Sequence, residues 1–404
     1  MTRTEKLLAE LIALPSVNPA FAPATGVSAR QARFPVSHYG EKNVADFLAT
    51  VAARAGLEIE FQTVLGVRGH VRAWKSGDMS PHSKLERSNL IARLRPAGNV
   101  RRTILLAPHL DTVGAEEAQF VPRLKNGRLH GRGACDTKGS VAAMLTALCE
   151  LAESKNRPRE TEIVFAGLID EEQAQAGSRA LAKSKFKADL AIVGEPTRSQ
   201  VVTAHKGSFW LQLKTRGKAA HGATPHLGEN AIHEMARIVD VLETDYAAQL
   251  RRHKHALLGT ATVNVGTITG GKQPNIVPDG CTISIDRRTL PGETEGSVRR
   301  EITALLKSKK LSATIWSTKL APALALETDD KLPLVREFLR SVGQSRPAGV
   351  DYYCDAAVLS AGGIPSVVFG PGDIAQAHTA DEWISLVELE RGKNRLKKFL
   401  QGLP

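Results

Sequence analysis

The first two hundred residues carry apolar positions in two alternating patterns, helical spacing and short continuous runs. Helical spacing predicts helices at 2–14, 41–55, 140–153 and 178–183. The apolar runs predict strands at 57–64, 89–94, 103–107, 163–169 and 190–193. Strands that alternate with helices are typical of an α/β domain, so we expect a mostly parallel sheet with helices on both faces.

The pattern changes near residue 206, where a half-exposed strand begins. The predicted order is strand 209–215, helix 230–250, strands 261–269 and 281–290, helix 294–307 and strand 313–317. This β-α-β-β-α-β order is typical of a ferredoxin-like module. The α/β pattern then returns with helices 332–342 and 356–361, strand 365–369 and a final helix from 383. We therefore expect an α/β domain formed by 1–205 and 321–404, with an α+β domain, 206–320, inserted into it.

Residues able to bind a metal follow several of the predicted strands. They are His109, Glu171, Glu172, Glu195 and His378, and Asp136 lies in a glycine-rich turn. Each residue alone has an ordinary alternative as a turn or capping residue. In open α/β sheets, however, ligands bind beyond the carboxyl ends of the strands, where these side chains would converge.

The chemistry of these side chains favours a pair of divalent ions. Two histidines and several carboxylates suit Zn²⁺, with Co²⁺ or Mn²⁺ as alternatives. A carboxylate able to bridge two ions is typical of two-metal sites, in which the ions lie about 3.5–4 Å apart. Asp111 lies two residues beyond His109 on an extended segment, so it can face the imidazole and orient it.

Composition and charge exclude several other classes of protein. The net charge of +12 is spread along the chain and aromatic residues make up 5%, which favours a solvated basic surface over nucleic-acid binding. Electrostatic attraction of carboxylate-bearing substrates is a third interpretation. No apolar run is long enough to span a membrane, and the N-terminus does not resemble a signal peptide, so we expect a cytoplasmic protein. The four cysteines show no metal-binding or disulfide spacing. A polar insertion at 66–88 contains His70 and His82, which we interpret as surface residues.

Seven segments together resemble one family. They are HLDTV, GRGACDTKGS, LIDEEQAQAGSRAL, VGEPT, HGATPHLGENAI, DRRTLPGET and GPGDIAQAHTADEWI. In this order, over nearly the whole chain, they resemble the dinuclear zinc amidohydrolases and peptidases. That family includes acetylornithine deacetylase, succinyl-diaminopimelate desuccinylase, aminoacylase and the glutamate-releasing carboxypeptidases.

The resemblance implies a role for each residue of the site. His109 and Glu195 would hold one ion, Glu172 and His378 the other, and Asp136 would bridge them. Asp111 would orient His109, and a cis peptide bond would follow Asp136. Glu171 would be the general base, although the residues themselves do not say which of Glu171 and Glu172 faces the metal.

The resemblance also assigns residues outside the metal site. His221 matches a histidine that the family supplies from the partner subunit to stabilise the oxyanion, with His226 as a nearby alternative. Arg288 and Asn275 match substrate-binding residues, with Arg287 as the alternative to Arg288. Gly370 matches a loop that substrate approaches closely. The inserted domain would be the family's lid or dimerisation domain, and a homodimer would form through it.

The expected activity is hydrolysis of an N-acyl amino acid by a metal-activated water, as in the deacetylase and desuccinylase branch. A dipeptidase, carboxypeptidase or aminoacylase acting on small peptides or acyl amino acids is the alternative. A catalytically inactive binding protein on the same fold would lack a ligand or the base, yet every expected position is filled.

Overall fold

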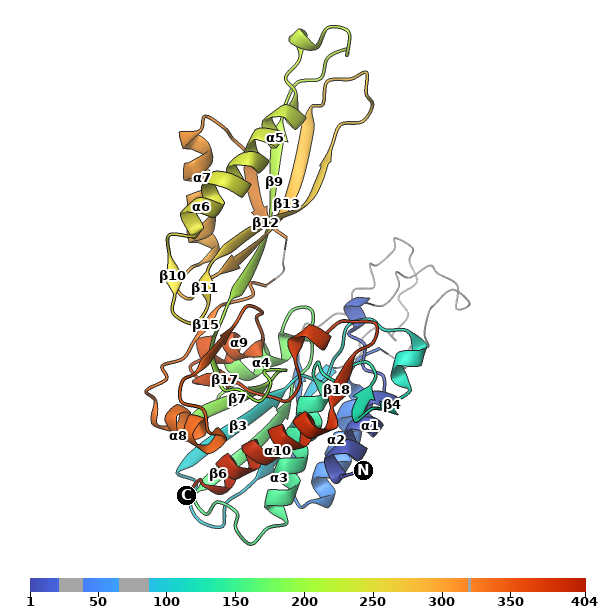
Figure 1. Ribbon diagram of the computed structural model, residues 1–404, viewed down its shortest axis with the longest axis vertical. Helices are drawn as coiled ribbons and strands as arrows, with labels where there is room; N and C mark the ends of the chain where they lie inside the picture. Colours follow the sequence, from blue (N-terminus) through green and yellow to red (C-terminus); the bar gives the residue numbers. More distant parts are fainter. Residues whose placement is uncertain (22–38, 65–86, 319–320) are drawn as a thin grey trace. The chain divides into compact units, whose positions relative to one another are not determined.

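The computed structural model describes residues 1–21, 39–64, 87–318 and 321–404 (Figure 1). The insertion at 66–88, with His70 and His82, therefore lies almost entirely outside the described residues. The chain divides into two compact units. Unit 1 comprises Met1–Thr203, Thr328–Ala348 and Cys354–Pro404, and unit 2 comprises Ala204–Glu327 and Gly349–Tyr353.

The main sheet has nine strands, and most of them belong to unit 1. Its order is β1 (Glu58–Val64), β2 (Arg87–Leu94), β6 (Thr161–Gly167), β3 (Arg102–Pro108), β7 (Leu190–Gly194), β17 (Ser366–Val368), β8 (Val202–His205) and β15 (Leu326–Glu327), with β16 (Ala348–Val350) paired to β8. The four central strands, from β6 to β17, are parallel to one another, whereas β1, β2, β8 and β15 join antiparallel. The sheet is thus mixed, and the expectation of a mostly parallel sheet is wrong. An apolar run marks a buried strand but does not encode the strand's direction.

Helices cover both faces of this sheet. They are α1 (Arg3–Ala13), α2 (Lys42–Arg54), α3 (Lys138–Ala152), α4 (Ala176–Lys183), α8 (Pro333–Val342), α9 (Asp355–Ala361) and α10 (Leu386–Gln401). Alternate residues of the central strands, such as Ile104 and Leu106 of β3, pack into one large core with α1, α2, α3, α8 and α10. Leu105 lies between them and points to the opposite face, where α9 contacts β7 and β17. In Figure 1, α3 and α10 run side by side across the first face.

A small antiparallel sheet lies beside the main one and corrects the prediction at the C-terminus. It contains β4 (Arg123–Lys125), β5 (Arg128–His130) and β18 (Trp383–Ser385) in the order β18-β5-β4. The final helix therefore begins at Leu386, where the Ser385 hydroxyl accepts a hydrogen bond from the Glu388 amide, and not at residue 383. The strands were missed because three residues are too few to show a period.

Unit 2 is a four-stranded antiparallel sheet with helices packed on it. The strands are β9 (Gly207–Arg216), β12 (Thr262–Gly270), β13 (Gly280–Thr289) and β14 (Thr314–Ser317), in the order β12-β13-β9-β14. The helices are α5 (Ala231–Val241), α6 (Ala247–Leu250) and α7 (Glu295–Ser308). A π-helical turn (Leu242–Tyr246) joins α5 to α6. Two further strands, β10 (Lys254–His255) and β11 (Gly259–Thr260), form a short hairpin. Apolar residues of α5, α7 and the sheet share one core. The element order β9-α5-β12-β13-α7-β14 is ferredoxin-like.

No helix within the described ranges has both the length and the apolar character that a membrane crossing requires.

An aromatic cluster tests how the elements of unit 1 depend on one another. Phe338 of α8 packs against Phe369, which follows β17, and Phe399 of α10, with ring centroids 5.0 and 4.6 Å apart. We expect Phe338→Ala to lower the free energy of unfolding by about 3–5 kcal/mol, because it removes a fully buried ring between three elements. Val387→Ala, at a side chain that is 65% exposed, is the control and should change stability little. Equal denaturant midpoints for both variants would contradict the packing.

Candidate metal and catalytic site

Neighbouring parallel strands bring the first two predicted ligands together. Strand β3 ends at Pro108 and β7 ends at Gly194, and these two residues are paired across the sheet. The next residue of each chain segment is a predicted ligand, so His109 and Glu195 lie side by side, with Nε2 3.8 Å from Oε1. Both side chains are buried. The alignment of the strand ends therefore positions this half of the site.

The segment after β6 brings two neighbouring glutamates, Glu171 and Glu172, to the same site. His109 forms an isolated bridge with Leu168, which sets the turn 170–175 beside it. Asp170 begins this turn with a φ of 68°, in a region that residues other than glycine seldom adopt. Such strain persists where the surroundings enforce it. Glu171 and Glu172 follow at the same edge of the sheet.

Asp136 lies between the two histidines. Its Oδ1 is 3.1 Å from His109 Nε2 and its Oδ2 is 3.2 Å from His378 Nε2. His378 Nε2 is also 3.2 Å from Glu172 Oε2. The ligand atoms of His109, Asp136 and Glu172 all lie within 4.8 Å of one another. Five predicted ligands from separate parts of the chain are thus brought together.

The loop that carries Asp136 is fixed by Glu382, a residue to which the sequence analysis gave no role. The buried Glu382 carboxylate accepts hydrogen bonds from the backbone amides of Gly133, Cys135 and Asp136 at 2.8–3.0 Å, and pairs with Arg132 at 2.7 Å. Glu382 lies in the TADEWI segment that carries the family resemblance, but nothing in the sequence distinguishes it from a solvated charge before the helix predicted from residue 383. The peptide bond between Asp136 and Thr137 is cis, as the resemblance implied.

Asp111 contacts more than the imidazole of His109. His109 Nδ1 is 3.0 Å from the main-chain oxygen of Asp111 and 3.5 Å from its carboxylate. The carboxylate also accepts the backbone amides of Glu171 and Glu172, each at 3.1 Å. Burial would raise the pKa of Asp111, but His109, hydrogen bonding and Arg87 outweigh burial and lower it. Asp111 is therefore an ionised anchor for both halves of the site.

The other carboxyl groups of the site, Glu171, Glu172 and Glu195, are crowded together and repel one another. Desolvation raises the pKa of Glu171 and of Glu195 well above the ordinary value, and repulsion from neighbouring carboxylates acts in the same direction. The pKa of Glu172 is raised by desolvation and by Asp136. These carboxylates also affect the imidazole: Asp136 and Glu172 raise the pKa of His378 to about 10. A set of two imidazoles and several crowded carboxylates fits divalent cations, which would neutralise this charge.

Two substrate-site candidates are neighbours within unit 2. His221 forms an isolated bridge with Ile276, and the Gly222 amide donates to the Asn275 main-chain oxygen at 2.8 Å. His221 and Asn275 are both exposed, as is the alternative His226. Their roles remain predictions.

The two neighbouring arginines have different environments. Arg287 is completely buried and bonds to Tyr246 and Glu293, whereas Arg288 is half-exposed and pairs with Asp286 at 2.9 Å. The two side chains lie on opposite faces of β13, because burial alternates along this strand. Arg288 is thus the accessible member of the pair.

Gly370 has a packing role in unit 1. A Cβ atom there would lie 2.3 Å from Ser140 Oγ and 2.5 Å from the Glu195 main-chain oxygen, so no side chain fits. Its amide donates to Thr197 Oγ1 at 3.2 Å. Gly370 therefore holds the Glu195 loop close to α3, and its contact with substrate remains a prediction.

Comparison with known proteins identifies the class. The model of peptidase family M20/M25/M40 matches residues 105–402, and the chain belongs to this family. It is 32% identical to an acetylornithine deacetylase from Myxococcus xanthus over 76% of this chain and 82% of the relative. It is 29% identical to the acetylornithine deacetylase of Proteus mirabilis over 98% and 96% of the two chains.

Solved structures agree on the fold. The aminopeptidase PepT of Bacillus cereus matches with a TM-score of 0.74 and 23% identity over 99% of this chain and 97% of that chain. A protein of Bacillus subtilis described as a dinuclear metal binding peptidase from the M20 family matches with a TM-score of 0.67 and 13% identity over 99% and 97%. The protein is accordingly a metal-dependent hydrolase that acts on amide bonds.

Metal uptake should release protons from this site. His378 has its pKa raised to about 10 in the metal-free fold, from 6.5, so its imidazole is protonated at pH 7. Metal ligation requires the neutral imidazole, and the affinity for Zn²⁺ should rise with pH and level off above about pH 10. The stability that His378 contributes to the metal-free protein is present below pH 6.5 and lost as the pH rises through about 10.

Calorimetry in buffers of different ionisation enthalpy measures the protons released at pH 7. His378→Gln should release fewer protons, whereas His226→Gln, at an exposed histidine of unit 2, should match the wild type. A Zn²⁺ affinity that does not change between pH 6.5 and 9 would contradict the assignment.

Proposed function

We propose that the protein hydrolyses the amide bond of an N-acyl amino acid, using two divalent metal ions and Glu171 as the general base. The observation that carries this proposal is the position of Asp136, whose two carboxylate oxygens each face a different histidine at 3.1 and 3.2 Å. This arrangement suits a carboxylate shared by two ions. His109 and Glu195 would hold one ion, and Glu172 and His378 the other.

The proposed chemistry assigns a proton transfer to Glu171. When bound, the ions would acidify a water molecule and stabilise negative charge on the acyl oxygen. Glu171 takes a proton from the water as the oxygen of the water bonds to the acyl carbon. It then delivers that proton to the amine nitrogen as the carbon–nitrogen bond breaks. This double role needs a carboxyl group that can both accept and return a proton.

The substrate class rests on relatives and on charge. Acetylornithine deacetylases are among the relatives near 30% identity, which favours a deacylase over the peptidase alternatives. Arg288 is accessible and could pair with the carboxylate of an acyl amino acid. Asn275 would contact the substrate separately, as the resemblance implies. Zn²⁺ is the proposed metal, with Co²⁺ or Mn²⁺ as alternatives.

A substrate panel with a base variant tests the reaction. The panel comprises N-acetylornithine, N-succinyl-diaminopimelate, N-acetylmethionine, a dipeptide and an acyl-glutamate. We expect Zn²⁺-loaded protein to hydrolyse one acyl amino acid, and Glu171→Gln to lower kcat by about 10²–10⁴-fold, because the amide cannot accept the proton. Glu117→Gln, at an exposed glutamate, is the control. Full activity in Glu171→Gln would refute the base, and hydrolysis of the dipeptide alone would move the protein to the peptidase branch.

A homodimer through unit 2 is part of the proposal, with His221 supplied to the partner subunit's site. Strand β12 ends the sheet of unit 2 and most of its residues are half- or fully exposed, which leaves an edge able to meet a second copy.

Complementation between two inactive variants tests this dimer. Glu171→Ala and His221→Ala should each be inactive alone. A mixed dimer would contain one site with both groups intact, so co-expression should restore about a quarter of wild-type activity if subunits assemble at random. His226→Ala in place of His221→Ala is the control and should be active alone. Absence of restored activity from purified mixed dimers would contradict donation in trans.

A further inference from the structure

A buried polar network links the start of the chain to the turn that carries Glu171 and Glu172. It contains Asn18, Glu41, Arg87, Asp111 and Asp170, and all five residues are less than 9% exposed. Asn18 lies in the loop after α1, Glu41 is the N-cap residue of α2, and Arg87 begins β2. None of these three residues was singled out by the metal-ligand pattern.

Arg87 supplies positive charge to this network. Its Nη1 donates to Asp170 Oδ1 at 2.8 Å, and its Nε donates to Glu41 Oε2 at 2.9 Å, with a second bond from Nη2 to Glu41 Oε1. The Asp170 amide also donates to Glu41 Oε1, at 3.2 Å. Asp170 is thereby held through its side chain and its backbone by one arginine–glutamate pair.

Asn18 connects this pair to the anchor of the site. Its Nδ2 donates to Asp170 Oδ1 at 3.0 Å and to Asp111 Oδ2 at 2.7 Å. Its own backbone is fixed, since its amide donates to the Thr112 main-chain oxygen at 2.8 Å. One amide group therefore holds two buried carboxylates that would otherwise repel each other.

The network fixes the base-bearing turn from two directions. Asp170 has a left-handed backbone and its main-chain oxygen accepts the Gln175 amide at 2.6 Å, which closes the turn. Asp111 accepts the amides of Glu171 and Glu172. A shift of either carboxylate would therefore move the backbone that carries the proposed base and a proposed ligand.

We propose that Arg87 is a positioning residue for the hydrolytic reaction, which acts through Asp170 and Asn18 to hold Asp111 and the Glu171–Glu172 backbone in the productive geometry. The inference rests on the function proposed above. Arg87 does not touch the reacting atoms; its contribution is to keep three carboxylates in fixed positions.

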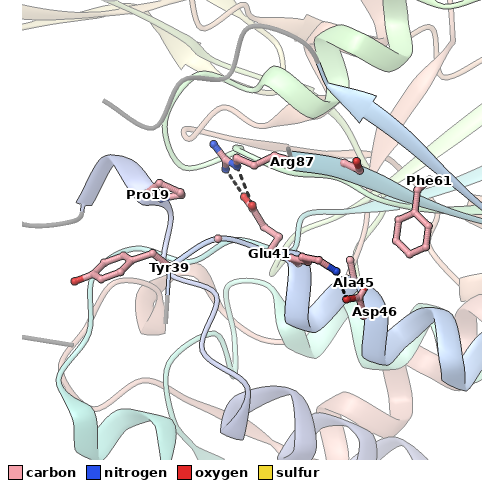
Figure 2. A pocket seen from close by; sticks show the side chains of 10 residues that line it. Pro19, Tyr39, Glu41, Ala45, Asp46, Phe61 and Arg87 are labelled. Atoms are coloured by element: carbon pink, nitrogen blue, oxygen red, sulfur yellow. Dashed lines mark hydrogen bonds and ion pairs between the residues drawn. The ribbon is translucent and has the colours of Figure 1, made fainter. Parts of the chain in front are cut away.

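A cavity beside Arg87 makes this inference testable by chemical rescue. Arg87 and Glu41 line a cavity of about 380 Å³, together with Pro19, Tyr39 and Phe61. Figure 2 shows the Glu41 carboxylate pointing at the Arg87 guanidinium, with dashed lines between them. Truncation to Ala would join the space of the guanidinium to this cavity, so a guanidinium ion from solution could take its place beside Glu41 and Asp170.

The experiment compares Arg87→Ala with Arg95→Ala. Arg95 lies just past the other end of β2 and also pairs with two acids, Glu58 and Glu162, but its side chain is 53% exposed. For the substrate found with the panel, we expect kcat of Arg87→Ala to fall about 10–100-fold, the range seen when the partners of metal ligands are removed, while KM changes little. The visible absorption spectrum of the Co²⁺-loaded variant should shift, because the ligand geometry changes. Arg95→Ala should match the wild type in both measurements.

Guanidinium, added at concentrations well below those that unfold the protein, should restore kcat and the Co²⁺ spectrum of Arg87→Ala. Urea, which has the same shape but no charge, should restore neither. An Arg87→Ala protein with wild-type kcat and spectrum would overturn the inference, and so would a loss of kcat with an unchanged spectrum and no rescue.

Asn18→Ala provides a second route if Arg87→Ala does not fold. It should reproduce the lower kcat and the shifted Co²⁺ spectrum, and wild-type values for both would overturn the inference. Where both variants fold, their combined effect should be less than the product of the single effects, because both act through Asp170. If the wild-type protein hydrolyses nothing in the panel, the proposed function fails, and the Co²⁺ spectra alone then decide whether Arg87 positions the ligands.

Discussion

Repulsion among carboxyl groups collected at one edge of the sheet is the constraint on which the arrangement of this site depends. Asp111, Asp136 and Glu195 are buried there, and Glu171 and Glu172 stand beside them. The chain compensates this charge in part with donors that are fixed before any ligand binds. Backbone amides donate to Asp111, the imidazoles lie against Asp136, and Arg87 pairs with Asp170. Three carboxyl groups of the site, Glu171, Glu172 and Glu195, keep raised pKa values, and bound cations would lower them.

The supporting residues come from segments that are distant in sequence. Glu382, almost 250 residues after Asp136, holds the Asp136 loop through three backbone amides. Asn18 and Arg87 hold the turn after β6 from two further segments. Such bonds do not touch the reacting groups, but they fix the positions of the ligands. Loss of the residues that hold metal ligands typically costs about 10–100-fold in metal affinity or activity. The architecture of unit 1 is therefore part of the site's chemistry.

A residue of the site could be predicted from the sequence where it follows a recognisable apolar strand. His109, Glu171, Glu172 and Glu195 each follow an apolar strand, so their convergence at one sheet edge was predictable. The pairing of Pro108 with Gly194 aligns His109 with Glu195, and the bridge between His109 and Leu168 aligns the segment that carries Glu171 and Glu172. Asn18, Glu41, Arg87 and Glu382 are single polar residues in or beside irregular segments, with no period to distinguish them from solvated surface. The prediction of strand direction at the sheet edges failed for a related reason, since a buried strand shows the same apolar run in either direction.

The two halves of the site differ in burial, and this difference bears on how the site would work. His109 is almost fully buried between strand ends, whereas the side chain of His378 is 53% exposed on a loop where its φ is 60°. Burial lowers the pKa of an imidazole and its carboxylate partners raise it; for His378 the partners Asp136 and Glu172 are the larger influence. The His109 half is set by the sheet and tolerates little movement. The side chain of His378 is open to solvent, so its carboxylate partners, and not burial, have the larger effect on its charge.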